Sequence, residues 1–169
     1  MWAQHWLKSQ ELANSQASLE DGDSSSKRLV VTLYEALNSA DSDTVVKIVA
    51  TDLEWWFHGP PSHQFLMRML TGQTSSFRFI PQSITCFGPT VLVEGCDNSR
   101  SISWVHALTL SHGIITQIRE YFNTSLTVTR FAHSDISAAA ADSLRCPCLW
   151  ESSVSDRVGK SVPGLVLAL

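Results

Sequence analysis

Residues 101–123, SISWVHALTLSHGIITQIREYFN, constrain the fold of this chain more than any other stretch. Two runs rich in β-branched and aromatic residues flank the dipeptide His112-Gly113, a pattern that predicts a β-hairpin with a tight turn. A two-residue turn fixes the register, because residues at equal distances from the turn then face each other across the strands. Cross-strand neighbours can therefore be assigned from the sequence.

One face of this hairpin is expected to line a pocket. In the two-residue register it pairs Trp104 with Tyr121 and His106 with Arg119, and it ends at Asn123. A face that only packs on a core would be aliphatic, whereas polar and aromatic side chains above an apolar floor are typical of a ligand pocket. A loop with an odd residue count, or a bulge, would instead shift the opposed pairs and displace one strand's residues along the other, although each strand keeps its own alternation.

The opposite face of the hairpin is expected to be apolar. It carries Val105, Ala107, Ile118 and Phe122. An exposed apolar patch of this kind is typical of a surface that another chain covers. The sequence therefore predicts a homodimer, with the C-terminal arm of the same chain as the alternative cover.

Length and charge limit the classes of protein to consider. The 169 residues, 44% of them hydrophobic, suffice for one domain that folds alone. A net charge of -4 gives no basic footprint, so no nucleic acid is expected as a partner. No apolar run reaches the roughly 20 residues that span a bilayer, and the first residues resemble neither a signal nor a transit peptide. We expect a protein of the cytoplasm, with the nucleus as a second location, and no membrane partner.

Two helices are predicted ahead of the first strand. Residues 1–22 are interpreted as a polar tail or a short helix that ends at the turn-forming Asp-Gly-Asp motif at 21–23. Apolar residues then recur at helical spacing to about Asn38, and Asp41-Ser42-Asp43 offers a cap for a second, shorter helix. These helices would supply an apolar surface on which a sheet can pack.

An aromatic-rich strand is predicted at residues 52–58, ended by a Gly-Pro-Pro sequence that no strand interior tolerates. Strand alternation puts Glu54, Trp56 and His58 on one face, which we assign to the pocket. Glu54, and Glu94 on a later strand, are the acids expected to line the cavity, where desolvation can raise the pKa of a carboxyl group. A third helix and further strands should separate them.

The order helix, helix, strand, helix and then a run of antiparallel strands predicts the α+β class. We expect a cone-shaped half-barrel in which a curved antiparallel sheet wraps around the N-terminal helices and leaves a cavity inside. This domain should span residues 23–131, followed by a linker at 132–148 and a C-terminal arm at 149–169.

Several motifs occur on these predicted elements: DLEWWFHGPP at 52–61, MRMLTG at 67–72, SWVH at 103–106, GIITQIREYFNT at 113–124 and WESSVSDRVGKSVPG at 150–164. Through them the chain resembles the plant wound-induced protein 1 family, a branch of the nuclear transport factor 2-like (SnoaL-like) superfamily. The resemblance covers most of the chain from residue 28 on. It implies a cone-shaped α+β barrel, often dimeric through its sheet, and an association with wounding, stress or senescence. It does not supply a reaction.

Asn123 departs from the pattern of the enzymes in that superfamily, which typically have an aspartate there that acts as acid or base. An amide does not exchange a proton near neutral pH, so the resemblance implies that this role is lost. We therefore expect a non-catalytic ligand-binding or interaction module of a stress response. Its pocket would take a small apolar or carboxylate ligand.

The alternative function is that of a small isomerase, cyclase or hydrolase. A nearby Arg119 disfavours imidazolium, so a neutral His106 would be the base, with Tyr121 and Arg119 stabilising an oxyanion. The other interpretation is that His106 merely forms a hydrogen bond with Tyr121 or a backbone carbonyl inside a wet cavity. The predicted site thus has the catalytic candidates His106 and Tyr121 and the ligand-binding candidates Glu54, Trp56, His58, Glu94, Trp104, Arg119 and Asn123.

No cofactor and no metal is expected. The histidines lack a third ligand at suitable spacing, and the four cysteines show no zinc-binding pattern. Spacing and compartment favour reduced, non-catalytic thiols.

Overall fold

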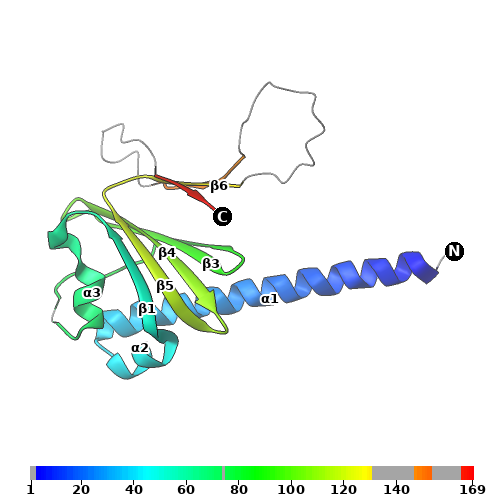
Figure 1. The fold of residues 1–169 in the computed structure, drawn as a ribbon, viewed down its shortest axis with the longest axis horizontal. Coiled ribbons are helices and arrows are strands. Elements are labelled where there is room, and N and C mark those ends of the chain that lie inside the picture. The colour runs from blue at the N-terminus through cyan, green and yellow to red at the C-terminus, as the bar shows by residue number, and fades with distance from the viewer. Residues whose placement is uncertain (1–2, 74, 131–146, 154–164) are drawn as a thin grey trace.

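The chain folds around one five-stranded sheet, which has helices on one face and a small three-stranded sheet on the other (Figure 1). This computed structural model describes residues 3–73, 75–130, 147–153 and 165–169, with side chains from residue 21 onward. The predicted α+β class is confirmed by the order of the elements.

The helices match the predicted number and order, but the first is longer than expected. They are α1 (Ala3–Ser39), α2 (Ser42–Ile48), a 3-10 turn (Pro61–His63) and α3 (Phe65–Leu70). The motif at 21–23 lies inside α1, so the break expected there is wrong. A single glycine in a helix costs only about 1 kcal/mol relative to alanine and does not by itself end a helix.

The capping residue of α2 is confirmed as Asp41. Its carboxylate accepts hydrogen bonds from the Thr44 backbone N–H at 3.1 Å and from Thr44 Oγ1 at 2.6 Å. These bonds favour the charged form and hold the pKa of Asp41 below its usual value. The cap satisfies a backbone donor that the first turn of a helix leaves free.

The central sheet is mixed rather than antiparallel throughout. Its strands are β1 (Val49–His58), β2 (Ser83–Phe87), β3 (Thr90–Asp97), β4 (Ile102–Ser111) and β5 (Ile114–Phe122). Their order is β1-β5-β4-β3-β2, with antiparallel pairs from β2 to β5 as predicted. The strand pair β1–β5 is parallel, because the chain crosses over through α3 before it enters the meander.

The hairpin of β4 and β5 contains a bulge that changes its faces. The two-residue turn is confirmed, since His112 and Gly113 both have positive φ, 52° and 77°. Beyond the pair Leu110/Ile115, however, Thr109 faces Gln117, and Thr116 is the extra residue. The hydroxyl of Thr116 donates to the carbonyl oxygen of Thr109 at 3.3 Å. From Gln117 on, the side chains of β5 therefore point to the face opposite the expected one.

The C-terminal part of the chain forms a second, smaller sheet. It contains β6 (Leu126–Thr129), β7 (Cys148–Glu151) and β8 (Leu165–Ala168), in the order β7-β6-β8. Strands β7 and β8 belong to the predicted arm, of which the described residues lie on the domain (Figure 1). Most of the predicted linker, Cys146 and residues 154–164 of the arm fall outside the described residues.

Each face of the central sheet carries its own apolar core. The core on the α1 side includes Ile118 and Phe122, so both were wrongly assigned to the outer face. The outer core includes Val105 and Ala107, against which residues from the small sheet pack: Leu126, Val128, Trp150 and Leu167. Strand β6 and the described strands of the C-terminal arm thus cover Val105 and Ala107, the two residues of the predicted patch that do face outward. The homodimer stays a prediction.

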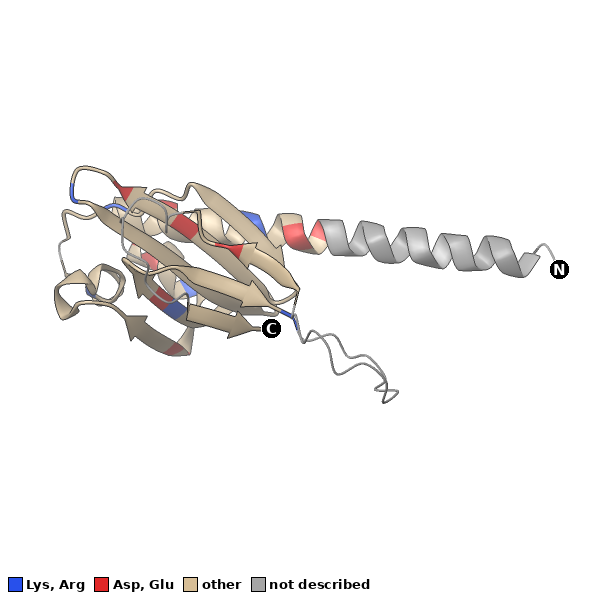
Figure 2. Ribbon diagram, turned by 90° about the horizontal axis from the view of Figure 1, so that it is seen from above, with Lys and Arg blue, Asp and Glu red and all other residues tan. Residues whose placement is uncertain are grey.

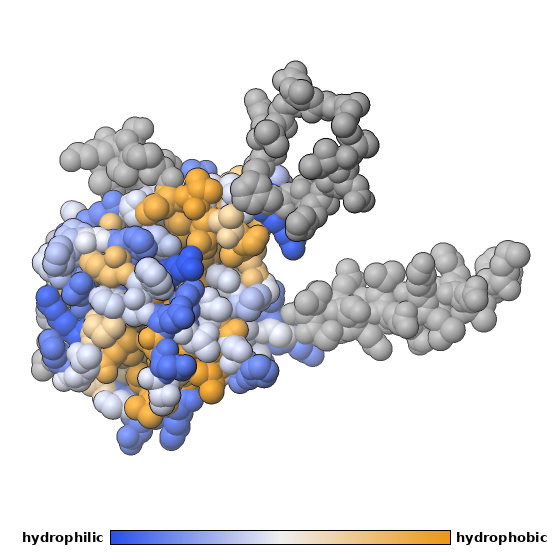
Figure 3. All heavy atoms as spheres, in the orientation of Figure 1, coloured by the Kyte–Doolittle hydropathy of each residue, from blue (hydrophilic) through white to orange (hydrophobic). Residues whose placement is uncertain are grey.

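The described surface shows no concentration of one charge. Acidic and basic residues are interspersed over the domain (Figure 2). Hydrophobic side chains gather beside the C-terminal strands and near α2 on the face seen in Figure 3, and exposed apolar residues include Val46 of α2 and Val166 of β8. Within the described ranges, no helix combines the length and the apolar character needed to cross a membrane.

A substitution at Gly95 tests how tightly β3 packs against Trp104 and the segment before β2. A Cβ at this position would lie 2.5 Å from the carbonyl oxygen of Ile80 and against the indole of the buried Trp104. We expect Gly95→Ala to lower the free energy of unfolding by about 1–3 kcal/mol through overpacking, measured by urea denaturation.

The matched control is Gly22→Ala. Gly22 lies within α1, and a Cβ there would meet nothing within 4 Å. Because alanine favours a helix by roughly 0.5–1 kcal/mol over glycine, this variant should not lose stability. A Gly95→Ala protein as stable as the native one would contradict the packing described for Trp104.

Candidate functional site

Because of the bulge at Thr116, the residues expected to form one site lie on opposite faces of the sheet. His106 and Glu120 face each other across β4 and β5, and both point into the core on the α1 side. Arg119 pairs with Ala107 and Tyr121 with Val105, residues of the outer face. Arg119 and Tyr121 therefore lie on the opposite side of the sheet from His106. The predicted constellation of a His106 base with Arg119 and Tyr121 as oxyanion donors is wrong.

Instead, His106 belongs to a core polar cluster made of Tyr34, Trp55, His106 and Glu120. The Tyr34 hydroxyl lies 2.8 Å from His106 Nδ1, and His106 Nε2 lies 3.1 Å from Glu120 Oε1. Trp55 Nε1 donates to the second oxygen of Glu120 at 2.5 Å. The cluster joins α1, β1, β4 and β5, and the side chains of His106 and Glu120 are both 0% exposed.

Hydrogen positions in this cluster follow from the chemistry of its members. Burial, reinforced by the charge of Glu120, raises the pKa of Tyr34 well above its ordinary value, so the phenol keeps its proton. The phenol can then donate to Nδ1, and the Nε2–H of His106 can donate to Glu120. Both ring nitrogens of His106 and both carboxylate oxygens of Glu120 thus have partners within the cluster.

Aromatic rings pack around His106 in this cluster. The ring of His106 lies 4.8 Å from that of Trp104, 4.9 Å from Phe79 and 5.9 Å from Tyr34, between ring centroids. A base must come within hydrogen-bond reach of its substrate, and here both imidazole nitrogens are already bonded to protein groups. The cluster is therefore a structural network, as in the interpretation of a self-satisfied His106, although its partners are Tyr34 and Glu120.

The predicted site residues of β1 come together on the outer face. Glu54, Trp56 and His58 lie beside Gln117, Arg119 and Tyr121 of β5. The Glu54 carboxylate accepts a bond from Gln117 Nε2 at 2.7 Å, and the His58 ring stacks on Tyr121 at 4.8 Å. The Trp56 side chain is 54% exposed. These residues share one face as expected, but it is the outer face and not the inside of the cone.

Arg119 and Tyr121 interact with each other on that face. Burial raises the pKa of Tyr121, and the charge of Arg119 and its hydrogen bond to the phenol partly oppose this effect.

Two further predicted pocket residues have structural positions. Trp104 is buried in the core on the α1 side, against Tyr34 and Phe79. Asn123 follows β5 with a φ of 53°, a left-handed conformation that asparagine tolerates better than most residues. Its backbone N–H donates to the Ser103 carbonyl at 2.8 Å, and its Oδ1 accepts from the Ser103 N–H at 3.0 Å. Asn123 thus extends the strand pair.

Glu94 points away from the cone and holds the C-terminal arm. Its carboxylate is buried and accepts from the Ser152 hydroxyl at 3.1 Å, the Ser153 hydroxyl at 2.8 Å and the Ser153 N–H at 3.2 Å. Hydrogen bonds to a carboxylate are stronger than those between neutral groups. The predicted role in a pocket is therefore replaced by that of an anchor for the residues that follow β7.

A pocket with a volume of about 540 Å³, which the sequence did not predict, lies beside the C-terminal end of α1. It is formed where α1 ends, α2 begins and α3 leads into the segment before β2. The run of small and polar residues at 71–76 is the sequence signal that could have pointed there, because loops of this composition often carry binding sites. The described lining residues are Ala36, Leu37, Asn38, Ala40, Asp41, Ser42, Val45, Val46, Met69, Leu70, Gly72, Gln73, Ser75, Ser76, Phe77 and Arg78.

Neither the cluster nor the pocket has the character of a metal centre. In the part of the chain that the structure describes, no three His, Cys, Asp or Glu side chains are grouped to hold an ion. Cys86 and Cys148 are not joined in disulfides.

These features define a small α+β protein whose core polar cluster is closed and whose pocket lies apart from it. A family model described as "Wound-induced protein WI12" matches residues 67–169, more than half of the chain. The chain belongs to this wound-induced protein family, which confirms the resemblance found in the sequence.

Two curated relatives support the assignment. Wound-induced protein 1 of Solanum tuberosum is 62% identical over 107 residues, which cover 61% of this chain and 100% of that protein. Senescence associated gene 20 of Arabidopsis thaliana is 54% identical over 110 residues, with coverage of 61% and 100%. Among solved structures, an NTF2-like protein from Burkholderia xenovorans is similar at 24% identity and a TM-score of 0.46, over 59% of this chain and 89% of that one.

The core polar cluster predicts a large cost for removing its acid. Glu120→Ala would leave Nε2 of the buried His106 and Nε1 of the half-buried Trp55 without an acceptor. We expect a loss of about 2–6 kcal/mol in the free energy of unfolding, because two donors each lose an acceptor at about 1–3 kcal/mol, measured by chemical denaturation. Glu54→Ala is the control, because that carboxylate lies exposed on the neighbouring strand and should cost less than about 1 kcal/mol. Equal effects of the two substitutions would contradict the network.

The Glu94 anchor predicts a local effect. Glu94→Ala removes the acceptor for Ser152 and Ser153, so the backbone amides of β7 should exchange with deuterium faster while those near the C-terminal end of α1 keep their protection. Hydrogen-exchange mass spectrometry of the peptide spanning 147–153 measures this. Unchanged exchange in β7 would show that pairing with β6 alone holds the strand.

Proposed function

We propose that this chain is a non-catalytic ligand-binding protein of the response to wounding and senescence. Its family membership and the names of its two curated relatives support the biological setting. The observation that carries the non-catalytic part is the closure of the core polar cluster, in which His106 has no exposed surface and both of its ring nitrogens are bonded. A catalytic base needs access to its substrate.

The pocket at the helix ends supports small-molecule binding. Its volume of about 540 Å³ lies within the range of about 300–1,000 Å³ that is common for ligand pockets. An apolar interior with a few polar groups at the rim is also typical of such sites. This pocket replaces the cone interior as the place for a ligand.

An interaction module is the second candidate, favoured by the exposure of Trp56. Trp56 is 54% exposed and lies beside Arg119 on the outer face. Tryptophan and arginine are both enriched at protein interfaces. In this role the outer face of β1 and β5, rather than the pocket, would contact a partner.

A thermal-shift screen tests the proposed function. The native protein is heated with a panel of small apolar acids, ketones and alcohols, and a ligand that binds only the folded state raises the melting temperature in a saturable way. At 100 times its Kd the added stability is about 2.7 kcal/mol. Mass spectrometry of the recovered compound should show an unchanged mass.

The outcomes separate the candidates. A product that accumulates with time would make the protein an enzyme and overturn the proposal. A panel without any stabilising compound would leave the interaction module as the better candidate.

A further inference from the structure

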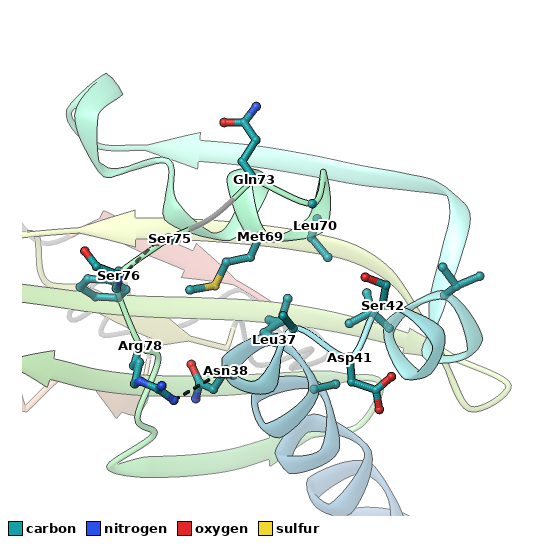
Figure 4. Close-up of a pocket in the computed structure, with 16 residues that line it drawn as sticks. Leu37, Asn38, Asp41, Ser42, Met69, Leu70, Gln73, Ser75, Ser76 and Arg78 are labelled. Carbon is teal, nitrogen blue, oxygen red and sulfur yellow. Dashed lines mark hydrogen bonds between the residues drawn. The ribbon is translucent and has the colours of Figure 1, made fainter.

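The inner wall of the pocket is apolar. Leu37 from the last turn of α1 is 6% exposed, and Phe77 from the segment before β2 is 1% exposed. Figure 4 shows Leu70 of α3 pointing toward Leu37, while the thioether of Met69 extends toward the side of Ser75 and Ser76. Val45 of α2 completes this wall. Such a wall binds hydrocarbon, because burying apolar surface is favourable by roughly 25 cal/mol per Å².

The rim of the pocket is polar and carries one charge of each sign. The Asp41 carboxylate is occupied, since it caps α2 through Thr44. Arg78 is exposed on the opposite side of the opening and points toward Asn38 (Figure 4). Its guanidinium has five N–H donors, and among the described residues it makes one hydrogen bond, from Nη1 to the Asn38 carbonyl oxygen at 3.2 Å. No carboxylate in the described ranges forms a salt bridge with it.

The backbone that carries Arg78 is fixed. The side-chain amide of Asn38 donates to the Phe79 carbonyl oxygen at 2.8 Å and accepts from the Phe79 N–H at 3.0 Å. Phe77 and Phe79, on either side of Arg78, are both buried in the core. The guanidinium is thus attached to a rigid segment beside the pocket, which lowers the entropy that binding would cost.

We infer that the pocket between α1, α2 and α3 binds a small amphipathic monocarboxylate, with its apolar body on Leu37, Met69 and Leu70 and its carboxylate on Arg78. This inference rests on the proposed function and names its ligand class. A neutral apolar compound would leave the free donors of Arg78 unused, and arginine is well suited to a planar carboxylate. A dianion is disfavoured, because the charge of Asp41 lies on the same rim.

Binding of octanoate and of 1-octanol, measured by isothermal titration calorimetry, tests the ligand class. We expect octanoate to bind the native chain more tightly than 1-octanol. In Arg78→Gln the affinity for octanoate should fall about tenfold, the effect of losing a hydrogen bond to a charged group, while that for 1-octanol stays the same. Raising the salt concentration should weaken octanoate binding alone.

Two further variants complete the design. Arg68→Gln removes an exposed arginine of α3 that does not line the pocket, and it should bind both compounds as the native chain does. Val45→Trp fills the pocket and should abolish binding of both, with circular dichroism to confirm that it is folded. Equal octanoate affinities of the native chain and Arg78→Gln would overturn the role of Arg78, while the proposed function would stand.

The same design separates the inference from the function on which it rests. Binding that survives Val45→Trp would place the ligand outside this pocket and overturn the inference. Failure of both compounds to bind the native chain would overturn it as well. In that case, binding of another compound from the thermal-shift panel would preserve the proposed function. If no compound of that panel binds, the inference and the proposed function both fail.

Discussion

The fold depends on satisfying one carboxylate that has no contact with water. Glu120 is fully buried, and an unpaired charge there would cost several kcal/mol. Trp55 and His106 supply its hydrogen bonds, and Tyr34 in turn bonds the second nitrogen of His106. The position of α1 on the sheet and the attachment of the edge strand β1 are therefore linked through one set of side chains. Aromatic rings around His106 exclude water and strengthen these bonds, because electrostatic interactions are stronger in a medium of low dielectric constant.

The same closure divides the molecule into regions with different tasks. The inside of the cone, where a ligand pocket was expected, holds the core polar cluster that stabilises the fold. The outer face of the sheet is covered in part by the C-terminal strands, with Glu94 as their anchor, and remains exposed around Trp56. A pocket lies at the ends of three helices, where side chains of α1 and α3 form an apolar wall beside Arg78. The proposed function therefore belongs to the periphery of the fold.

Features that depend on neighbours in sequence could be predicted, whereas those that depend on distant pairing could not. The Asp41 cap and the His112-Gly113 turn each follow from a few adjacent residues, and both are confirmed. The extra residue Thr116 has no sequence signal of its own, because a threonine fits a regular strand as well as a bulge, and yet it moves Arg119 and Tyr121 to the other face. The pocket could not be predicted for a related reason. Its wall is formed by three helix ends and a loop, so no single stretch of sequence contains the residues that line it.

The parallel pairing of β1 with β5 affects how the chain can fold as it is synthesised. The strands from β2 to β5 each pair with the next one along the chain, so the meander can form as soon as it emerges. The partner of β1, in contrast, follows about 55 residues later, and at a ribosomal rate of 5–20 residues per second this corresponds to a delay of roughly 3–11 s. During that time Trp55, Trp56 and Phe57 have no sheet to join. A nascent segment of this composition, without a paired neighbour, is prone to aggregate until β5 has been synthesised.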